Sequence, residues 1–156
     1  MADQPGYNQY LTSGPTQTLR VFAILLGAGA FDVAPTEAPC VGYRVLTIAG
    51  EYTQAAAGGA VNMEIQWSPW AADVVAPALS WFPIVAYAVG AVAVNVDTQS
   101  LLQAELVQYG SVGAVREPFS FEITLPTATE RVRVACAESG VVGNPGDCGL
   151  TALFSL

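Results

Sequence analysis

Apolar and polar residues alternate along most of the chain after residue 17. Residues 61–67, 119–125, 131–136 and 150–156 each place an apolar side chain at every second position. A period of two is the pattern of a β-strand with one face in the core and the other in solvent. Residues 92–96 repeat the pattern more weakly. We therefore expect these segments to be half-buried strands.

Other apolar segments have no polar face. Residues 19–26 and 43–49 are apolar on both sides, which predicts central strands or strands whose outer face is covered by another subunit. Residues 80–87 are a further strand candidate, and Pro83 predicts an edge or a bulge there. Residues 100–109 fit a short helix and a strand about equally well.

Turn signals separate the strand candidates. Gly58-Gly59, Ser68-Pro69 and residues 143–147 are rich in the residues that favour turns. Residues 126–129 are short enough to join the strands on either side into a hairpin, which would place Glu122 opposite Arg131 or Arg133. The chain thus contains eight or nine strands and at most one short helix. This pattern predicts an all-β protein, a single β-sandwich of jelly-roll or Greek-key type.

The first 17 residues differ from the rest of the chain. They are mostly polar and contain prolines and glycines, yet they carry Tyr7, Tyr10 and Leu11. We expect an extended N-terminal arm over residues 1–17 and the sandwich over residues 18–156. The three apolar side chains are candidate contacts to a partner.

Composition removes most kinds of chemistry. The chain has 156 residues, of which 12% are charged and 53% hydrophobic, and the net charge is −8. All five cations are arginine and there is no histidine, so the commonest general base, the commonest zinc ligand and the Schiff-base lysine are missing. An acidic chain without basic clusters is not expected to bind nucleic acid. We therefore expect no enzyme, no cofactor and no metal.

Membrane insertion and secretion are also not expected. Residues 1–6 have neither a positive segment nor an apolar one, so they do not form a secretory signal. The longest apolar runs, residues 21–31 and 84–96, fall short of the roughly 20 residues that span a bilayer.

Some alternatives stay open at this point. Cys40, Cys136 and Cys148 could all be small buried apolar residues, or the last two could form a disulfide on neighbouring strands. Glu138, Asn144 and Asp147 could supply oxygen ligands to calcium. Glu64 and Glu122 could face each other as the two carboxylates of a glycoside hydrolase.

Tryptophans form the most noticeable aromatic group. Trp67 continues the inward series of its strand and is expected in the core. Trp70, Trp81 and Phe82 stand at loop or strand-end positions. They could anchor a protein interface, form a platform for a sugar ring, or cap the sandwich.

The second half of the chain carries a resemblance. Gln66-Trp67-Ser68-Pro69 and Ser80-Trp81-Phe82-Pro83 precede Glu130-Arg131-Val132-Arg133-Val134, an Asn144-Pro145-Gly146 turn and a last strand at residues 150–156. Over roughly residues 60–156 this arrangement resembles small β-sandwich virion proteins of tailed bacteriophages. Capsid decoration (cement) proteins and related head or tail accessory modules are examples.

The resemblance implies a structural protein rather than an enzyme. It would bind the outer surface of a capsid, with the major capsid protein and copies of itself, in a trimer, as partners. Tyr7, Tyr10, Leu11, Trp70, Trp81 and Phe82 would be the contact residues. The alternatives are a tail or neck component of the virion and a carbohydrate-binding module that uses the tryptophans.

Overall fold

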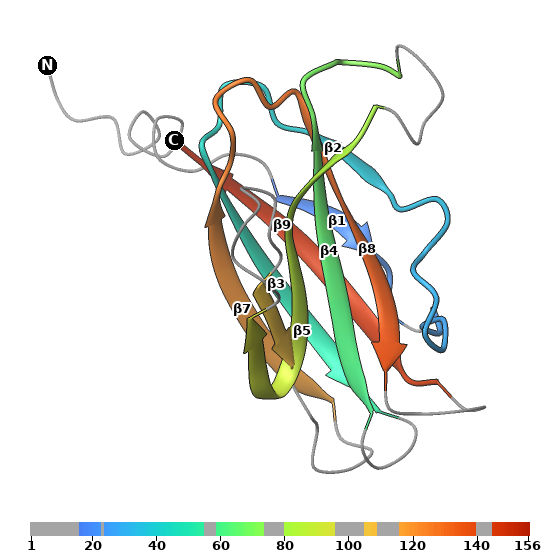
Figure 1. Ribbon diagram of the computed structural model, residues 1–156. Helices are drawn as coiled ribbons and strands as arrows, with labels where there is room; N and C mark the ends of the chain where they lie inside the picture. The colour runs from blue at the N-terminus through green and yellow to red at the C-terminus, as the bar shows by residue number, and fades with distance from the viewer. Residues whose placement is uncertain are drawn as a thin grey trace, which may run out of the picture.

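The computed structural model describes residues 16–22, 24–54, 59–73, 80–95, 105–108, 116–139 and 145–156. These residues form nine β-strands and no helix (Figure 1). The strands are β1 (Thr16–Arg20), β2 (Glu37–Pro39), β3 (Val45–Thr53), β4 (Ala60–Ser68), β5 (Phe82–Asn95), β6 (Glu105–Gln108), β7 (Glu117–Thr124), β8 (Arg131–Ser139) and β9 (Asp147–Ser155). No helix in this described part is long and apolar enough to cross a membrane.

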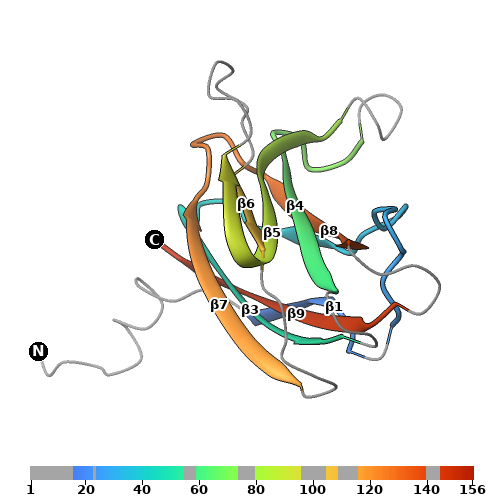
Figure 2. The same cartoon turned by 60° about the horizontal axis from the view of Figure 1, so that its bottom comes forward.

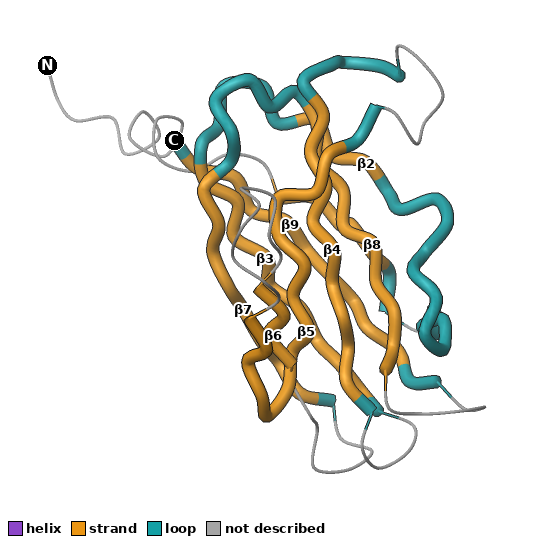
Figure 3. Tube along the Cα trace, in the orientation of Figure 1, coloured by secondary structure: helices purple, strands orange, loops and turns teal. Residues whose placement is uncertain are grey.

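Two antiparallel sheets pack face to face. One has four strands in the order β1-β9-β3-β7, and the other has five in the order β2-β8-β4-β5-β6. Figure 2 shows the two layers, and Figure 3 shows in teal the loops that join them at the top of that view. The predicted all-β sandwich is confirmed.

The order of the strands is that of a jelly roll. If β6 is set aside, the first strand pairs with the last, the second with the next to last, and so on inward: β1 with β9, β2 with β8, β3 with β7, and β4 with β5. Such nested pairing arises when one long antiparallel ribbon folds over on itself, and it defines the two-sheet jelly roll.

Alternating burial explains why these segments become strands. In β3 every second side chain is buried, and β9 follows the same pattern along most of its length. Leu46, Ile48 and Tyr52 of β3 meet Met63 and Ile65 of β4 across the core, and all five side chains have no exposed surface. Burial of such side chains, at roughly 25 cal/mol per Å² of apolar surface, is the main force that holds the sheets together.

The predicted hairpin between β7 and β8 is wrong. β7 lies in the four-stranded sheet and β8 in the five-stranded sheet, so residues 126–129 cross from one layer to the other. Leu125, which precedes them, is buried, and its amide bonds to the carbonyl of Arg44. Glu122 consequently lies opposite Thr47. Arg133 lies opposite Gln66, far from the predicted partner.

Two apolar segments also differ from expectation. Strand β1 ends at Arg20, and residues 21, 22 and 24–26 lie outside any strand rather than in the second half of one. At Pro83 the predicted irregularity is present: the register between β4 and β5 shifts after Ile65, so that Gln66 pairs with Pro83. Within the ambiguous stretch 100–109, residues 105–108 are the strand β6.

Residues 1–15 of the predicted arm lie outside the described residues. Tyr7, Tyr10 and Leu11 are therefore not placed. Strand β1 begins at Thr16, two residues before the predicted start of the sandwich, and pairs with β9 from its first residue. Thr16 and Gln17 thus belong to the sandwich.

Candidate interaction surface

The segment between β1 and β2 runs along one side of the sandwich. Figure 1 shows it in blue beside β8, and Figure 2 places it there from a second direction. It meets both layers, because Leu25 bridges to Asp147 of β9 and Ala28 bridges to Glu138 of β8. The segment therefore covers one open side between the sheets.

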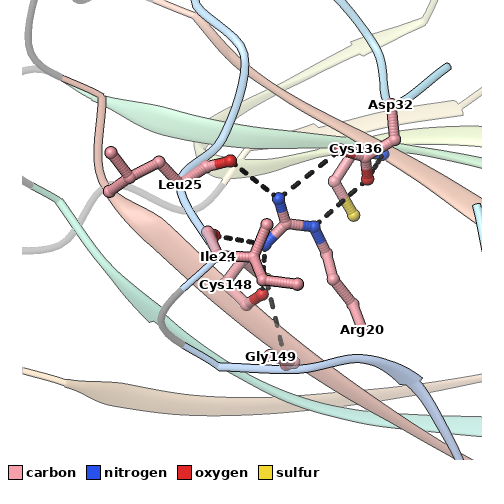
Figure 4. A network of polar contacts seen from close by, with 7 residues as sticks. All are labelled: Arg20, Ile24, Leu25, Asp32, Cys136, Cys148 and Gly149. Atoms are coloured by element: carbon pink, nitrogen blue, oxygen red, sulfur yellow. Dashed lines mark hydrogen bonds and ion pairs between the residues drawn. The ribbon is translucent and has the colours of Figure 1, made fainter.

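A buried arginine holds this segment in place. Arg20, 6% exposed, stands at the end of β1. Its guanidinium donates to the carbonyls of Ile24 (2.7 Å) and Leu25 (3.0 Å) and to the carbonyl of Cys148 (2.6 Å). It also pairs with the carboxylate of Asp32 at 3.1 Å. Figure 4 shows these contacts, which we call the Arg20 network.

The network extends into the backbone of β8. Asp32 accepts a hydrogen bond from the amide of Cys136 through its carboxylate, and its own amide donates to the carbonyl of Cys136 at 3.0 Å. Gly27 and Gly29 exchange backbone hydrogen bonds with Glu138. Buried polar groups need hydrogen-bond partners. Because these bonds tie the loop to β8, they hold its backbone in one conformation over the core.

The outer side of the same segment is apolar. Asp32 is the only charged residue between Val21 and Thr36, and it is engaged by Arg20. The large apolar side chains exposed here are Val21 (59%), Ile24 (52%), Leu25 (63%), Phe31 (40%) and Val33 (99%). We call these five residues the loop surface. Apolar side chains that a fixed backbone presents to solvent are typical of a protein-interaction site.

Trp81 does not lie on the surface. Its side chain is 6% exposed and contacts two guanidinium groups, Arg131 at 4.7 Å and Arg133 at 4.2 Å from the ring centroid. Cation–π contacts of this kind stabilise an indole inside a protein. An interface anchor or a sugar platform needs an exposed ring, so Trp81 serves as a cap of the sandwich in this structure.

Arg131 joins this cap to the loop that carries Trp70. It pairs with Glu37 and Asp73, and its Nε donates to the carbonyl of Trp70 at 2.7 Å. The ring of Trp70 is half-buried and lies 6.0 Å from that of Phe82, which is 37% exposed. Trp67, as expected, packs against the core. Trp70 and Phe82 are thus the two predicted contact residues that the structure places at the surface. The loop surface is a candidate site that the sequence did not predict.

The two candidate catalytic glutamates are not brought together. Glu64 lies on β4 of the five-stranded sheet and Glu122 on β7 of the four-stranded sheet. Both belong to the outward series of their strands, so the whole sandwich separates them. Packed sheets alone stand about 10 Å apart, and two outward side chains on opposite sheets stand farther apart still, beyond the range of retaining and of inverting pairs. The glycoside hydrolase alternative is therefore wrong for this pair.

One of the predicted calcium ligands, Glu138, already has protein partners. Glu138 is fully buried and its carboxylate is already engaged, by the Tyr52 hydroxyl at 2.5 Å and the Gly146 amide at 2.7 Å. Asn144 lies outside the described residues. Across the described part of the chain there is no group of three or more Asp, Glu or Cys side chains able to hold a metal ion.

Burial of the Tyr52–Glu138 pair affects its chemistry. Burial, followed by the hydrogen bond to Glu138, raises the pKa of the Tyr52 hydroxyl far above its ordinary value. The hydroxyl therefore stays protonated and donates to the carboxylate. This pair links β3 to β8 and acts as a polar tie between the layers.

A groove of about 770 Å³ lies against the four-stranded sheet. Its floor consists of small side chains such as Ala49, Ser120 and Thr151. Phe22 stands at one end, and the guanidinium of Arg116 lies 3.3 Å from the centre of that ring. Among the described residues that line the groove, Arg20 and Glu51 are the charged ones.

Comparisons with known proteins give a likeness of fold. No protein-family model and no curated protein sequence matches the chain. A structure of the infectious bursal disease virus Gx strain and one of that virus's VP2 subviral particle each show a TM-score of 0.49 and 12% identity over 92% of this chain. The K3 cleaved adhesin domain of Lys-gingipain from Porphyromonas gingivalis gives a TM-score of 0.40, with 13% identity over 90% of this chain and 73% of the adhesin chain.

These likenesses have limits. The chain spans 33% of the length of the two viral chains. None of the three structures is described as a decoration protein of a tailed bacteriophage. At such low identities and TM-scores they carry no argument about what this chain does, and the case for its function rests on the loop surface.

Proposed function

We propose that this chain is a structural protein of a virion that binds the outer surface of a bacteriophage capsid and decorates or cements its capsomers. The observation that carries the proposal is the loop surface, an apolar face that the Arg20 network fixes to the side of a jelly roll. Its partners would be the major capsid protein and further copies of this chain, as a trimer. The jelly roll is an architecture that viral capsid proteins and lectins both use.

The mechanism would be mechanical. Contact with a capsomer would remove the loop surface from water, and this burial of apolar side chains would stabilise the complex at each lattice position. Preorganisation lowers the cost, because the buried arginine orders the loop before binding. The net charge of −8 supports an exterior position, away from packaged DNA.

A charge placed on the loop surface should weaken binding strongly. In Leu25→Asp and Val33→Asp the new carboxylates would be buried without a partner in the complex. We expect each variant to weaken binding to purified capsids by about 30-fold or more, the effect of losing an interface hot spot. Co-sedimentation of the chain with capsids that lack it, followed by quantification of bound copies, measures this.

A matched control distinguishes an effect of the position of the new charge from an effect of the charge itself. Thr124→Asp adds the same charge at an exposed position of β7, in the four-stranded sheet, and should bind like the unmodified chain. Equal binding by all three variants would overturn the loop surface as the site. A few bound copies per particle would indicate a tail or neck component. No binding to any particle, together with tryptophan fluorescence quenching by a polysaccharide, would favour the carbohydrate-binding alternative.

The arm is the second part of the proposal. Because β1 begins at Thr16, removal of residues 2–14 leaves every strand of the sandwich intact. We expect this deletion to leave the thermal midpoint unchanged and to reduce capsid occupancy, since Tyr7, Tyr10 and Leu11 would be lost as anchors. Full occupancy by the shortened chain in the same sedimentation experiment would contradict an anchoring role. The double substitution Tyr7→Ala/Tyr10→Ala in the full chain keeps the length of the arm. It therefore shows whether the tyrosine side chains, rather than the length of the arm, are responsible for the occupancy.

A further inference from the structure

The groove on the four-stranded sheet follows a row of residues that crosses all four strands. Thr18 of β1 pairs with Thr151 of β9, and Ala49 of β3 pairs with both Thr151 and Ser120 of β7. All four residues line the groove, whose volume is about 770 Å³. Three strand spacings of about 4.8 Å make this row roughly 14 Å long. The row therefore forms an elongated floor of small side chains in a groove of the size that small-molecule sites have.

Larger apolar groups stand beside this floor. Phe22 packs over Gly149, since a Cβ atom built on that glycine would lie 3.0 Å from the Cβ atom of Phe22. Val21 and Pro118 also line the groove. Together with the methyl group of Ala49, these side chains place apolar contact surface next to the hydroxyls of the floor.

The charges that line the groove are compensated, although the chain as a whole has a net charge of −8. The charged residues among the described lining are Arg20 and Glu51. Arg20 is buried and pairs with Asp32, and Glu51 pairs with Arg116 at 3.2 Å. The net charge of the chain repels an anionic ligand. A cationic ligand would have to compete with Arg116 for Glu51, so the charges favour a neutral occupant.

The floor of the groove does not suit an added peptide strand. In the sheet, β9 is hydrogen-bonded to β1 and β3, and β3 is hydrogen-bonded to β9 and β7. An extended peptide joins a sheet at an open edge, whereas the groove lies on the face. A ligand there depends on side chains. Thr18, Ser120 and Thr151 supply hydroxyls, each of which can donate and accept a hydrogen bond.

We propose that this groove is a binding site for a neutral oligosaccharide. Sugars present hydroxyls that donate and accept hydrogen bonds, and C–H faces that are apolar, and the groove offers partners for both. The hydroxyls of Thr18, Ser120 and Thr151 bond to the sugar hydroxyls, while Phe22 and Pro118 contact the C–H faces. The site goes beyond the proposed capsid contact and does not depend on it.

Isothermal titration calorimetry with the full chain tests the proposal. The probes are neutral hexasaccharides of glucose, mannose, xylose, galactose and N-acetylglucosamine, with hexagalacturonate as the anionic comparison. We expect a neutral probe to bind and hexagalacturonate not to bind. Ser120→Ala and Thr151→Val should each weaken that binding by about 5-fold, which corresponds to about 1 kcal/mol for one hydrogen bond. Absence of binding by every neutral probe, or binding of hexagalacturonate as tight as that of the neutral probes, would overturn the proposal.

A bulky side chain in the groove locates the site. Ser120→Trp introduces an indole at an exposed position of the floor, so it should abolish binding while the thermal midpoint stays unchanged. Thr124→Trp adds the same ring to an exposed position of β7 that does not line the groove, and it should bind like the unmodified chain. Binding that survives Ser120→Trp would overturn the groove as the site.

One further variant separates the groove from the tryptophan-based alternative. The described residues that line the groove include no tryptophan. Trp70→Ala should therefore leave the affinity for the neutral probe unchanged, and the probe should not quench tryptophan fluorescence. Loss of binding in Trp70→Ala, with full binding in Ser120→Ala, would overturn the proposal in favour of a site at Trp70. Capsid binding plays no part in these outcomes.

Discussion

Replacing Arg20 by methionine is expected to lower the free energy of unfolding by about 3–5 kcal/mol, the usual cost of removing one partner of a buried ion pair. Methionine keeps the apolar stem but leaves the Asp32 carboxylate without its cation. The carbonyls of Ile24, Leu25 and Cys148 also lose their donor inside the protein. Urea unfolding followed by tryptophan fluorescence measures the change.

Two further variants show whether geometry or charge is responsible. Arg20→Lys retains the charge but cannot make the same fork of hydrogen bonds, so we expect a loss of about 1–3 kcal/mol. Arg116→Met removes the same side-chain type from an ion pair with Glu51, in which both side chains are about half exposed (51% and 46%). Such exposed pairs contribute at most about 1 kcal/mol. Equal losses in Arg20→Met and Arg116→Met would contradict the structural role of the network.

The same substitution should loosen the loop surface before the sheets. The amides of Leu26 and Gly29 bond to the carbonyls of Gly146 and Glu138, and these bonds depend on the path that Arg20 fixes. Their hydrogen exchange should therefore accelerate more than that of β3. A stable core with a mobile loop would lose preorganisation, which connects the network to binding.

Sequence alone predicted the strands whose two faces differ. β4, β7, β8 and β9 carry alternating patterns, and a one-residue shift would expose their apolar face. Most of β3 was expected as well, from a run that is apolar on both sides. Register and the general class of fold follow from this requirement. The jelly-roll pairing itself needs contacts between strands far apart in the chain, such as β1 with β9.

The failures have a common cause. The short turn at residues 126–129 looks the same in sequence whether it joins neighbours in one sheet or crosses between sheets. The crossing between sheets is determined by the burial of Leu125 and by the hydrogen bond from its amide to the carbonyl of Arg44, the residue before β3. For Trp81 the sequence left an interface anchor, a sugar platform and a cap of the sandwich open, and the two arginines of β8 that contact its buried ring favour the cap. In both cases the contacting arginines are far along the chain from the residue that they contact.

The loop surface was missed for the opposite reason. Residues 19–26 are apolar enough for a buried strand, so the pattern predicts burial where the structure exposes Val21, Ile24 and Leu25. One signal could have indicated the loop. A lone arginine inside an apolar run must find buried partners, and Arg20 has Asp32 twelve positions later as the nearest acidic residue downstream. That pairing requires the chain between them to turn back.

Gly146→Ala is the second substitution with a large expected effect. A Cβ atom built at this position overlaps the backbone oxygen of Thr53 and lies 3.0 Å from the Cα atom of Gln54. Both are backbone atoms at the end of β3, so no side chain can move aside. The glycine is required for space and not for its backbone angles, because only Gly29 and Gly42 among the described glycines have a positive φ.

Relief of that overlap would break two further contacts. The Gly146 amide donates to the buried carboxylate of Glu138 at 2.7 Å, and its carbonyl accepts from Leu26 at 2.9 Å. Overpacking costs about 1–3 kcal/mol, and a lost hydrogen bond to a charged group costs about 1.5–3 kcal/mol. We therefore expect Gly146→Ala to lower the free energy of unfolding by about 3–5 kcal/mol.

Gly42→Ala is the matched control for this substitution. Gly42 has a φ of 86° and nothing within 4 Å of a built Cβ, so alanine there meets backbone strain alone. That strain costs about 1–2 kcal/mol. Urea unfolding of the two variants side by side separates steric conflict from strain. Gly146→Ala could match Gly42→Ala in stability only if the backbone at the end of β3 moved at little cost. In that case the contacts among β3, Glu138 and the β1–β2 segment would not be rigid, and they could not hold the loop surface in place.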